Sequence, residues 1–375
     1  MLFAIFFFML KNSKIIVVKI GSSSLVDGKL QLRKAWIKSI CTDIAELKNS
    51  GKKVVIVTSG SVAVGRTYLK KNQQKLRIEQ KQAAAAIGQP MLINEYNKAF
   101  AKLGFTTAQI LLTINDIENR RSYLNAKNTF ETLFENNIIP VVNENDSVAT
   151  EELKFGDNDR LSALVAQMVS ADNLIILSDI DGLYSDDPNR NKNAKHISLV
   201  EKIDDEIFGS AKGVTSKTGS GGMATKIQAA KIAFEFGCNT IIASGQKNHP
   251  LKLLQTGARH TLFKSNQSPN KARKNWIVNS LVTKGKIIVD DGAANALKNH
   301  KSLLPIGIKN IEGKFTRGDK IIISTQSGKE IGKGITAYSS DDIKMIMGKK
   351  SNDIELALGF TGREAAVHAD DIVLI

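Results

Sequence analysis

Two short clusters of acidic and amide residues lie close together in the middle of the chain. The first, from Asn143 to Asp146, follows directly after the apolar run 137–142, and the second spans 157–159. The apolar run predicts a buried strand, and ligands of open α/β sheets bind just beyond the carboxyl ends of strands. Asn and Asp side chains can bind an ammonium and a carboxylate together. The clusters therefore predict a small amino-acid-like substrate, although an Asx turn or a helix N-cap would explain part of the second one.

Two turns that contain glycine and serine also follow predicted strands. Lys19 precedes the turn 21–24, where it could place an ammonium group beside backbone N–H groups that bind a phosphate. The alternative is a strand-edge lysine whose amine reaches solvent. The second turn, 58–63, opens a helix and suits binding of an anion or substrate at the helix N-terminus. An ordinary turn with a serine cap would have the same sequence.

A glycine-rich segment, 218–226, ends at Lys226 and reads TGSGGMATK. It contains the spacing of a dinucleotide-binding fingerprint, but no strand precedes it, so we reject that interpretation. It is not a P-loop either, because no Gly-Lys-Ser/Thr closes it. A loop that closes over the phosphates of a nucleotide fits better, and a surface linker is the alternative.

Alternating strands and helices must position these residues. Apolar runs predict strands at 14–20, 53–57, 105–112, 138–142, 173–178 and 240–243. Helical spacing predicts helices at 32–50, 79–100, 125–135, 161–168 and 226–236, the second of them interrupted by Gly88 and Pro90. Such alternation is typical of βαβ units. The predicted fold class is α/β, with a mostly parallel sheet sandwiched by helices.

The pattern changes near residue 264. The polar segment 264–275 predicts a linker. Beyond it, short strands are expected at 285–290, 320–324, 331–336 and 371–375, separated by glycine turns. A small β-rich second domain is therefore expected.

The net charge of the chain is +15 over 375 residues, which raises the possibility of nucleic-acid binding. The segment from Asn275 onward holds 14 lysines and arginines against 12 acidic residues, a net charge of +2. The excess therefore lies in the larger N-terminal part, as scattered lysines, and a lysine-rich solvated surface explains it. The two cysteines, Cys41 and Cys238, have no metal-ligand spacing and are expected to be free thiols.

The first ten residues, MLFAIFFFML, are strongly apolar. This run is far shorter than the ~20 residues of a spanning helix, and it lacks the preceding positive charge of a signal peptide. We interpret residues 1–8 as an extension upstream of a start at Met9. The alternative is a short membrane-associating segment.

The motifs, in order along the chain, resemble those of the glutamate 5-kinase family within the amino-acid kinase superfamily. They are VKIGSS from residue 18, VTSG from 57, VNEND from 142, GDND from 156, LSDIDGLY from 177 and GSGGMATK from 219. The tail resembles a PUA domain, a module that elsewhere binds RNA. Ser220 and Ser178 stand where the family usually has Thr, and both keep a hydroxyl. The extension at 1–8 has no counterpart in the family. The resemblance implies an amino-acid kinase domain at 9–263 and a PUA domain at 276–375, joined by the predicted linker at 264–275.

The activity implied by the resemblance is ATP- and Mg²⁺-dependent phosphorylation of the γ-carboxylate of L-glutamate, the first step of proline biosynthesis, in the cytoplasm. It also implies a homo-oligomer, proline as a feedback inhibitor, and transfer of the product to a γ-glutamyl phosphate reductase. We expect neither membrane association nor RNA binding, the latter because the tail carries little net charge. A kinase of another small acid in the superfamily, or an RNA-binding accessory protein, remains the alternative.

The resemblance also assigns residues. Lys19, Asp159 and Lys226 are the catalytic candidates, with Asp159 orienting the two lysines. The candidates for glutamate binding are Ser59, Asn143, Asp146 and Asn158. The candidates for ATP binding are Lys19, Ser178, Asp179, Ser220, Gly221, Gly222, Met223, Ala224, Thr225 and Lys226. No direct metal ligand is assigned.

Overall fold

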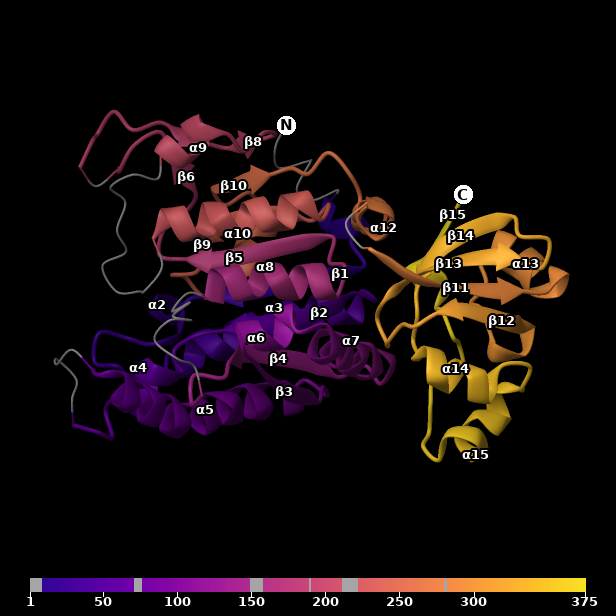
Figure 1. Cartoon of the computed structure of the whole chain (residues 1–375). Coiled ribbons are helices and arrows are strands. Elements are labelled where there is room, and N and C mark those ends of the chain that lie inside the picture. The colour runs from indigo at the N-terminus through magenta and orange to yellow at the C-terminus, as the bar shows by residue number, and fades with distance from the viewer. Residues whose placement is uncertain (1–8, 71–75, 149–157, 189, 211–221, 280–281) are drawn as a thin grey trace. The chain divides into compact units, whose positions relative to one another are not determined.

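A computed structural model describes residues 9–70, 76–148, 158–188, 190–210, 222–279 and 282–375 (Figure 1). The chain divides into two compact units, Met1–Pro269 and Asn270–Ile375. The expected extension 1–8 lies outside the described residues. Residues 9–12 are helical, and Leu10 is buried in the core of the first unit.

The first unit is built on an eight-stranded sheet with the order β3-β4-β2-β1-β5-β9-β10-β8. The strands from β3 to β9 in that order are parallel, whereas β10 runs antiparallel to β9. Their bounds are β1 Ile15–Ile20, β2 Lys53–Thr58, β3 Thr107–Leu112, β4 Ile139–Glu144, β5 Asn173–Ser178, β8 Leu199–Val200, β9 Asn239–Ser244 and β10 His260–Phe263. A separate hairpin pairs β6 (Leu183–Tyr184) with β7 (His196–Ile197). The predicted α/β class with a mostly parallel sheet is confirmed, while the last two strands of the sheet were not predicted.

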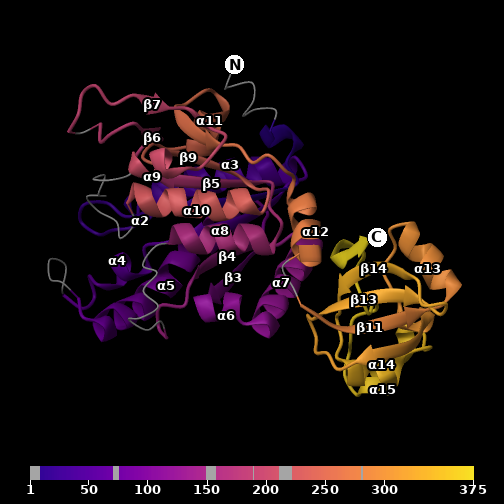
Figure 2. The same cartoon turned by 45° about the horizontal axis from the view of Figure 1, so that its top comes forward.

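Helices cover both faces of the sheet (Figures 1 and 2). Alternate residues of the strands enter two hydrophobic cores, one on each face. In β1, Ile16 and Val18 pack with one set of helices and Val17 packs with the other. The first set is α3 (Lys34–Asn49), α5 (Ile78–Ala101) and α11 (Pro250–Gln255), and the second is α7 (Arg120–Glu135), α8 (Asn158–Met168) and α10 (Met223–Glu235). The short helices are α2 Ser22–Leu25, α4 Ser61–Gly65, α6 Ile114–Glu118 and α9 Asp205–Gly209. Burial on both faces explains why the central strands are continuous apolar runs.

Helix α5 is continuous, so the predicted interruption at Gly88 and Pro90 is wrong. Gly88 is required by close packing instead. A Cβ atom there would lie 1.9 Å from the carbonyl oxygen of Ser61, and one at Gly65 would lie 1.8 Å from that of Ala84. Both glycines therefore let α4 and α5 touch backbone to backbone.

The second unit contains a five-stranded sheet with the order β12-β11-β13-β14-β15. Its strands are β11 Thr283–Val289, β12 Ile308–Gly313, β13 Lys320–Thr325, β14 Glu330–Ile335 and β15 Ile372–Leu374. Its helices are α12 Pro269–Asn279, α13 Asp291–Lys298, α14 Ser340–Ile346 and α15 Ile354–Leu358. The β-rich character was predicted, but β12 and the helices were not.

The segment 264–275, expected to be a linker, contains the first turns of α12. Helix α12 begins at Pro269, and proline fits the first position of a helix because its fixed φ is already helical. Arg273 of α12 forms an ion pair with Asp371, and the Nζ atom of Lys320 donates a hydrogen bond to the Val278 carbonyl at 3.1 Å. These contacts connect α12 to the sheet of the second unit. In the described part of the chain, no helix is long and apolar enough to cross a membrane.

Candidate active site

The carboxyl ends of four neighbouring parallel strands bring the chemistry-bearing residues to one edge of the sheet. In the order of the sheet, these ends carry Asn143 (β4), Ser59 (just after β2), Lys19 (β1) and Ser178 (β5). This is the edge at which open α/β sheets bind ligands.

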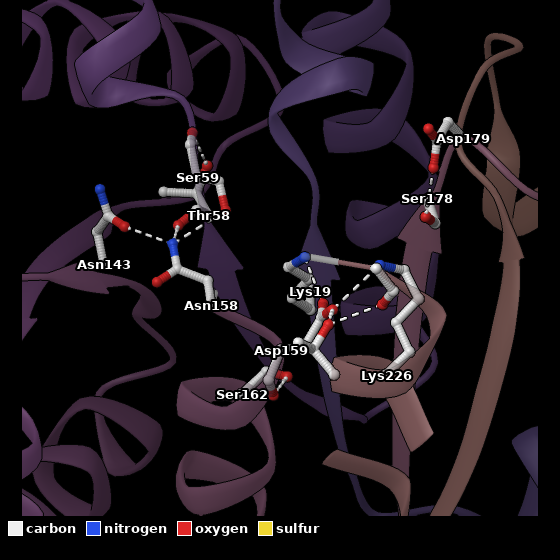
Figure 3. Close-up of polar contacts among 12 residues, drawn as sticks. Lys19, Thr58, Ser59, Asn143, Asn158, Asp159, Ser162, Ser178, Asp179 and Lys226 are labelled. Carbon is white, nitrogen blue, oxygen red and sulfur yellow. Dashed lines mark hydrogen bonds and ion pairs between the residues drawn. The ribbon is translucent and has the colours of Figure 1, made fainter. Parts of the chain in front are cut away.

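A buried charged cluster contains Lys19, Asp159 and Lys226 (Figure 3). The ammonium of Lys19 contacts one oxygen of Asp159, and Lys226 Nζ donates to the other at 3.1 Å. Exposed fractions are 6% for Lys19, 0% for Asp159 and 5% for Lys226. Buried charges persist when they are paired. Because one carboxylate faces two ammonium groups, the cluster carries a net positive charge that would attract an anion such as a phosphate.

Three elements meet at Asp159. Lys19 lies near the end of β1, Asp159 is in the first turn of α8, and Lys226 is in the first turn of α10. An acidic side chain is favoured in the first turn of a helix because the N-terminus of the helix is partially positive. The Thr225 hydroxyl also donates to Asp159, at 3.3 Å. The carboxylate therefore holds the end of β1 and the start of α10 together.

A neutral amide cluster lies beside the charged one. Asn158 directly precedes Asp159, yet its side chain joins Thr58, Ser59 and Asn143 (Figure 3). Its Nδ2 atom donates to the Thr58 carbonyl, to Ser59 Oγ at 2.9 Å and to Asn143 Oδ1 at 2.8 Å. Two consecutive residues at the start of α8 thus serve two clusters of different chemistry.

The amide cluster extends to Gln89, Ser61 and Asp146. Asn143 Nδ2 donates to Gln89 Oε1 at 2.6 Å, and Ser61 Oγ donates to Asp146 Oδ2 at 3.2 Å. Burial raises the pKa of Asp146, against the hydrogen bond from Ser61 and the charge of Lys81. A neighbouring ammonium ligand would favour the ionised form of this carboxylate. The cluster therefore offers both amide and carboxylate acceptors.

The structure describes most of the residues predicted to bind ATP, but not all of them. Ser178 is buried at the end of β5 and donates to the exposed Asp179 at 2.9 Å, and both lie apart from the lysines in Figure 3. Gly222 is the N-cap of α10, and the side chain of Met223 packs in the core. Thr225 is half-buried, Ala224 is exposed, and Ser220 and Gly221 lie outside the described residues.

Sequence reasoning missed Gln89 and Glu144. Gln89 lies in a helix and belongs to no recognisable motif, although the adjacent Gly88 indicates a close contact between helices. Burial, and then the charge of Asp146, raise the pKa of Glu144 to about 7. Its position inside the VNEND motif was visible, but its partial burial was not.

Comparison with known proteins identifies the family. The family model "Amino acid kinase family" matches residues 14–244, and the model "PUA domain" matches residues 285–358. The "Glutamate 5-kinase" of Paramagnetospirillum magneticum is 48% identical over 97% of this chain and 99% of that protein. The chain belongs to the glutamate 5-kinases of the amino acid kinase family.

The other similarities agree with this membership. The "Glutamate 5-kinase" of Rhodospirillum rubrum is 47% identical over 96% of each chain. A solved carbamate kinase from Giardia lamblia bound to AMP-PNP is 16% identical, with a TM-score of 0.50 over 68% of this chain and all of that one. At that identity the likeness concerns the fold alone. The predicted amino-acid kinase fold and PUA domain are thus both confirmed in this glutamate 5-kinase family member.

Proposed function

We propose that the chain transfers the γ-phosphoryl group of ATP to the γ-carboxylate of L-glutamate, forming γ-glutamyl phosphate and ADP, the first step of proline biosynthesis. The observation that carries this proposal is the buried Lys19–Asp159–Lys226 cluster beside the amide cluster around Asn158. One cluster is suited to phosphate groups and the other to an amino acid. The glutamate 5-kinases to which the chain is similar supply the identity of the acid.

The reaction needs no general base. A glutamate side chain with a pKa near ~4.3 is ionised at neutral pH. An oxygen of the carboxylate forms the new bond to the γ-phosphorus as the bond to the bridging oxygen of ADP breaks, and no proton moves. The obstacle is the approach of two anions, so catalysis depends on positioning and on neutralisation of charge.

We assign this neutralisation to Lys19 and Lys226. Both ammonium groups are pre-positioned by Asp159, so little reorganisation is needed during phosphoryl transfer. The ATP-binding candidates from Ser178 to Lys226 are proposed to hold the nucleotide. The described residues contain no group of three or more His, Cys, Asp or Glu that could hold a metal ion. Mg²⁺ is usually bound through substrate phosphates and one or two carboxylates, and it would neutralise phosphate charge here.

The proposed glutamate site uses the other cluster. Ser59 Oγ accepts from Asn158, which leaves its own proton to donate to a carboxylate. Asp146 and the Oδ1 atom of Asn158 would accept from the α-ammonium, and Asn143 would orient Asn158. The site would thus present one donor, Ser59, to a carboxylate and two acceptors, Asp146 and Asn158, to an ammonium. This matches an amino acid with a free ammonium group.

We also propose a cytoplasmic location, a homo-oligomer, inhibition by proline and transfer of the product to a reductase. The chemistry supports the last of these, because an acyl phosphate hydrolyses readily in water. RNA binding through the C-terminal segment is the alternative from a different class of function. The net charge of only +2 from Asn275 onward argues against it.

Hydroxylamine trapping of the acyl phosphate tests the function. Purified protein, ATP and Mg²⁺ would be incubated with L-glutamate, L-aspartate or N-acetylglutamate. We expect hydroxamate from L-glutamate alone. Hydroxamate from another acid would assign the chain to a different substrate of the superfamily. No turnover of ATP with any acid would overturn the proposal, and salt-dependent filter binding of RNA would then test the alternative.

A further inference from the structure

Gln89 is a buried glutamine of α5 that contacts the amide cluster from the neighbouring helix layer. Only 9% of the residue is exposed, and its Oε1 atom accepts from Asn143 Nδ2 at 2.6 Å. Gly88 lets the helix approach, since a Cβ atom there would lie 1.9 Å from the Ser61 carbonyl oxygen. A larger residue at 88 would therefore push α5 away from α4.

The backbone determines which way the Asn143 amide faces. The N–H of Glu144 donates to Asn143 Oδ1 at 2.9 Å, and a backbone N–H can only donate. The NH₂ group of Asn143 must then face the opposite side, toward Gln89. Ser61 Oγ is a more distant acceptor for it, at 3.4 Å. Because Asn143 is only 1% exposed, its NH₂ group needs an acceptor within the protein, and Gln89 supplies it.

The orientation of Asn158 follows from that of Asn143. Asn158 Nδ2 donates to the Thr58 backbone carbonyl, which can only accept, and to Asn143 Oδ1 at 2.8 Å. Its Oδ1 atom therefore faces away from this group of acceptors (Figure 3). No donor in the described part of the chain bonds to that oxygen. If Asn143 turned over, two NH₂ groups would face each other, and this arrangement of Asn158 would be lost.

We propose that Gln89 is a positioning residue that, together with the Glu144 N–H, holds the polarity of the substrate site. By accepting from Asn143, it keeps Asn143 Oδ1 toward Asn158 and thus keeps Asn158 Oδ1 available to a ligand donor. This inference rests on the proposed function, in which the ligand is L-glutamate and the donor is its α-ammonium. Gln89 accordingly contributes to discrimination between an acid with a free ammonium and one without it.

The test compares Gln89→Met, which has similar size but no amide acceptor, with Gln89→Glu, which keeps an acceptor oxygen. Each purified variant is assayed with L-glutamate and with glutarate, the same dicarboxylate without the ammonium. Glutarate is measured as a substrate and as a competitive inhibitor. We expect Gln89→Met to raise KM for L-glutamate about tenfold, since an unsatisfied buried donor remains. Its KM for ATP and its affinity for glutarate should change little.

The matched control is Gln109→Met, the same substitution at an exposed position of β3. It should leave both acids and ATP unaffected. Gln89→Glu should retain most of the preference for L-glutamate over glutarate, and it decides the question even if Gln89→Met does not fold. Equal weakening toward both acids, an unchanged Gln89→Met, or a Gln89→Glu that loses the preference would overturn the proposal. Failure of the proposed function is distinguishable, because the unaltered protein would then form no hydroxamate from L-glutamate.

Discussion

The charged cluster and the amide cluster are neighbours at the same sheet edge, yet they are held together by different physics. Asp159 holds two lysines through charge, whereas Asn158 holds its partners through directed hydrogen bonds between neutral groups. Charge attracts any anion, and an amide distinguishes a donor from an acceptor. From the proposed roles of the two clusters, we expect damage to the charged cluster to slow phosphoryl transfer and damage to the amide cluster to weaken binding of the amino acid.

The largest effect is expected from Lys226→Ala. This change removes one of two ammonium groups proposed to neutralise the transferred phosphoryl group, and such a cation can contribute about 10³-fold or more to turnover. We therefore expect kcat to fall by about that factor, with little change in KM for L-glutamate. Steady-state kinetics with hydroxamate detection measures both constants. Lys231→Ala, an exposed position on the same helix, is the matched control. A folded Lys226→Ala protein with near-normal kcat would refute the role.

The opposite pattern is expected from Asp146→Ala. A hydrogen bond to a charged group contributes about 1.5–3 kcal/mol, so loss of the carboxylate should raise KM for L-glutamate by roughly 10- to 100-fold. KM for ATP should stay nearly constant. Asp146→Asn separates charge from shape, because its amide oxygen still accepts from Ser61. If KM for L-glutamate were unchanged in both variants, Asp146 would not contact the ammonium.

The two clusters also differ in how much of them the sequence could predict. Lys19, Asn143 and Ser178 follow apolar runs, so their place at the sheet edge could be predicted from the strands. The closeness of Asp159 to both lysines was predicted from the family resemblance and is observed, while the catalytic roles stay predictions. Gln89 could not be predicted, because its contact depends on how α5 packs against α4. The only sign of this packing in the local sequence is Gly88, which allows the close approach of the two helices.

Parts of the fold also differ in how well the sequence predicts them. Long apolar runs in the first unit gave the central strands within one or two residues. The edge strand β12 was missed because its residues are mostly exposed and it lacks an apolar run. The short helices of the second unit were missed because five to eight residues carry little periodicity. Local pattern therefore predicts elements buried on two faces better than elements at an edge.

The smallest expected effect concerns Glu144, whose pKa is raised from 4.5 to about 7 by burial and by Asp146. Between these values the folded protein keeps a proton that the unfolded chain has lost, so the free energy of unfolding falls as pH rises. Glu144→Gln removes this loss, and we expect its Tm to exceed that of the unaltered protein by about 2–4 °C above neutral pH but not in acid.

The same ionisation should assist binding of the α-ammonium, because it places a second negative charge near Asp146. KM for L-glutamate should therefore fall a few-fold between about pH 6 and about pH 8, and this fall should be absent in Glu144→Gln. Glu135→Gln, at an exposed position of α7, should follow the unaltered protein in both measurements. Parallel pH profiles of KM for Glu144→Gln and the unaltered protein would show that Glu144 does not act on the substrate. The amide cluster would then recognise the amino acid only through the direction of its hydrogen bonds and through Asp146. Glu144 would contribute no charge to recognition.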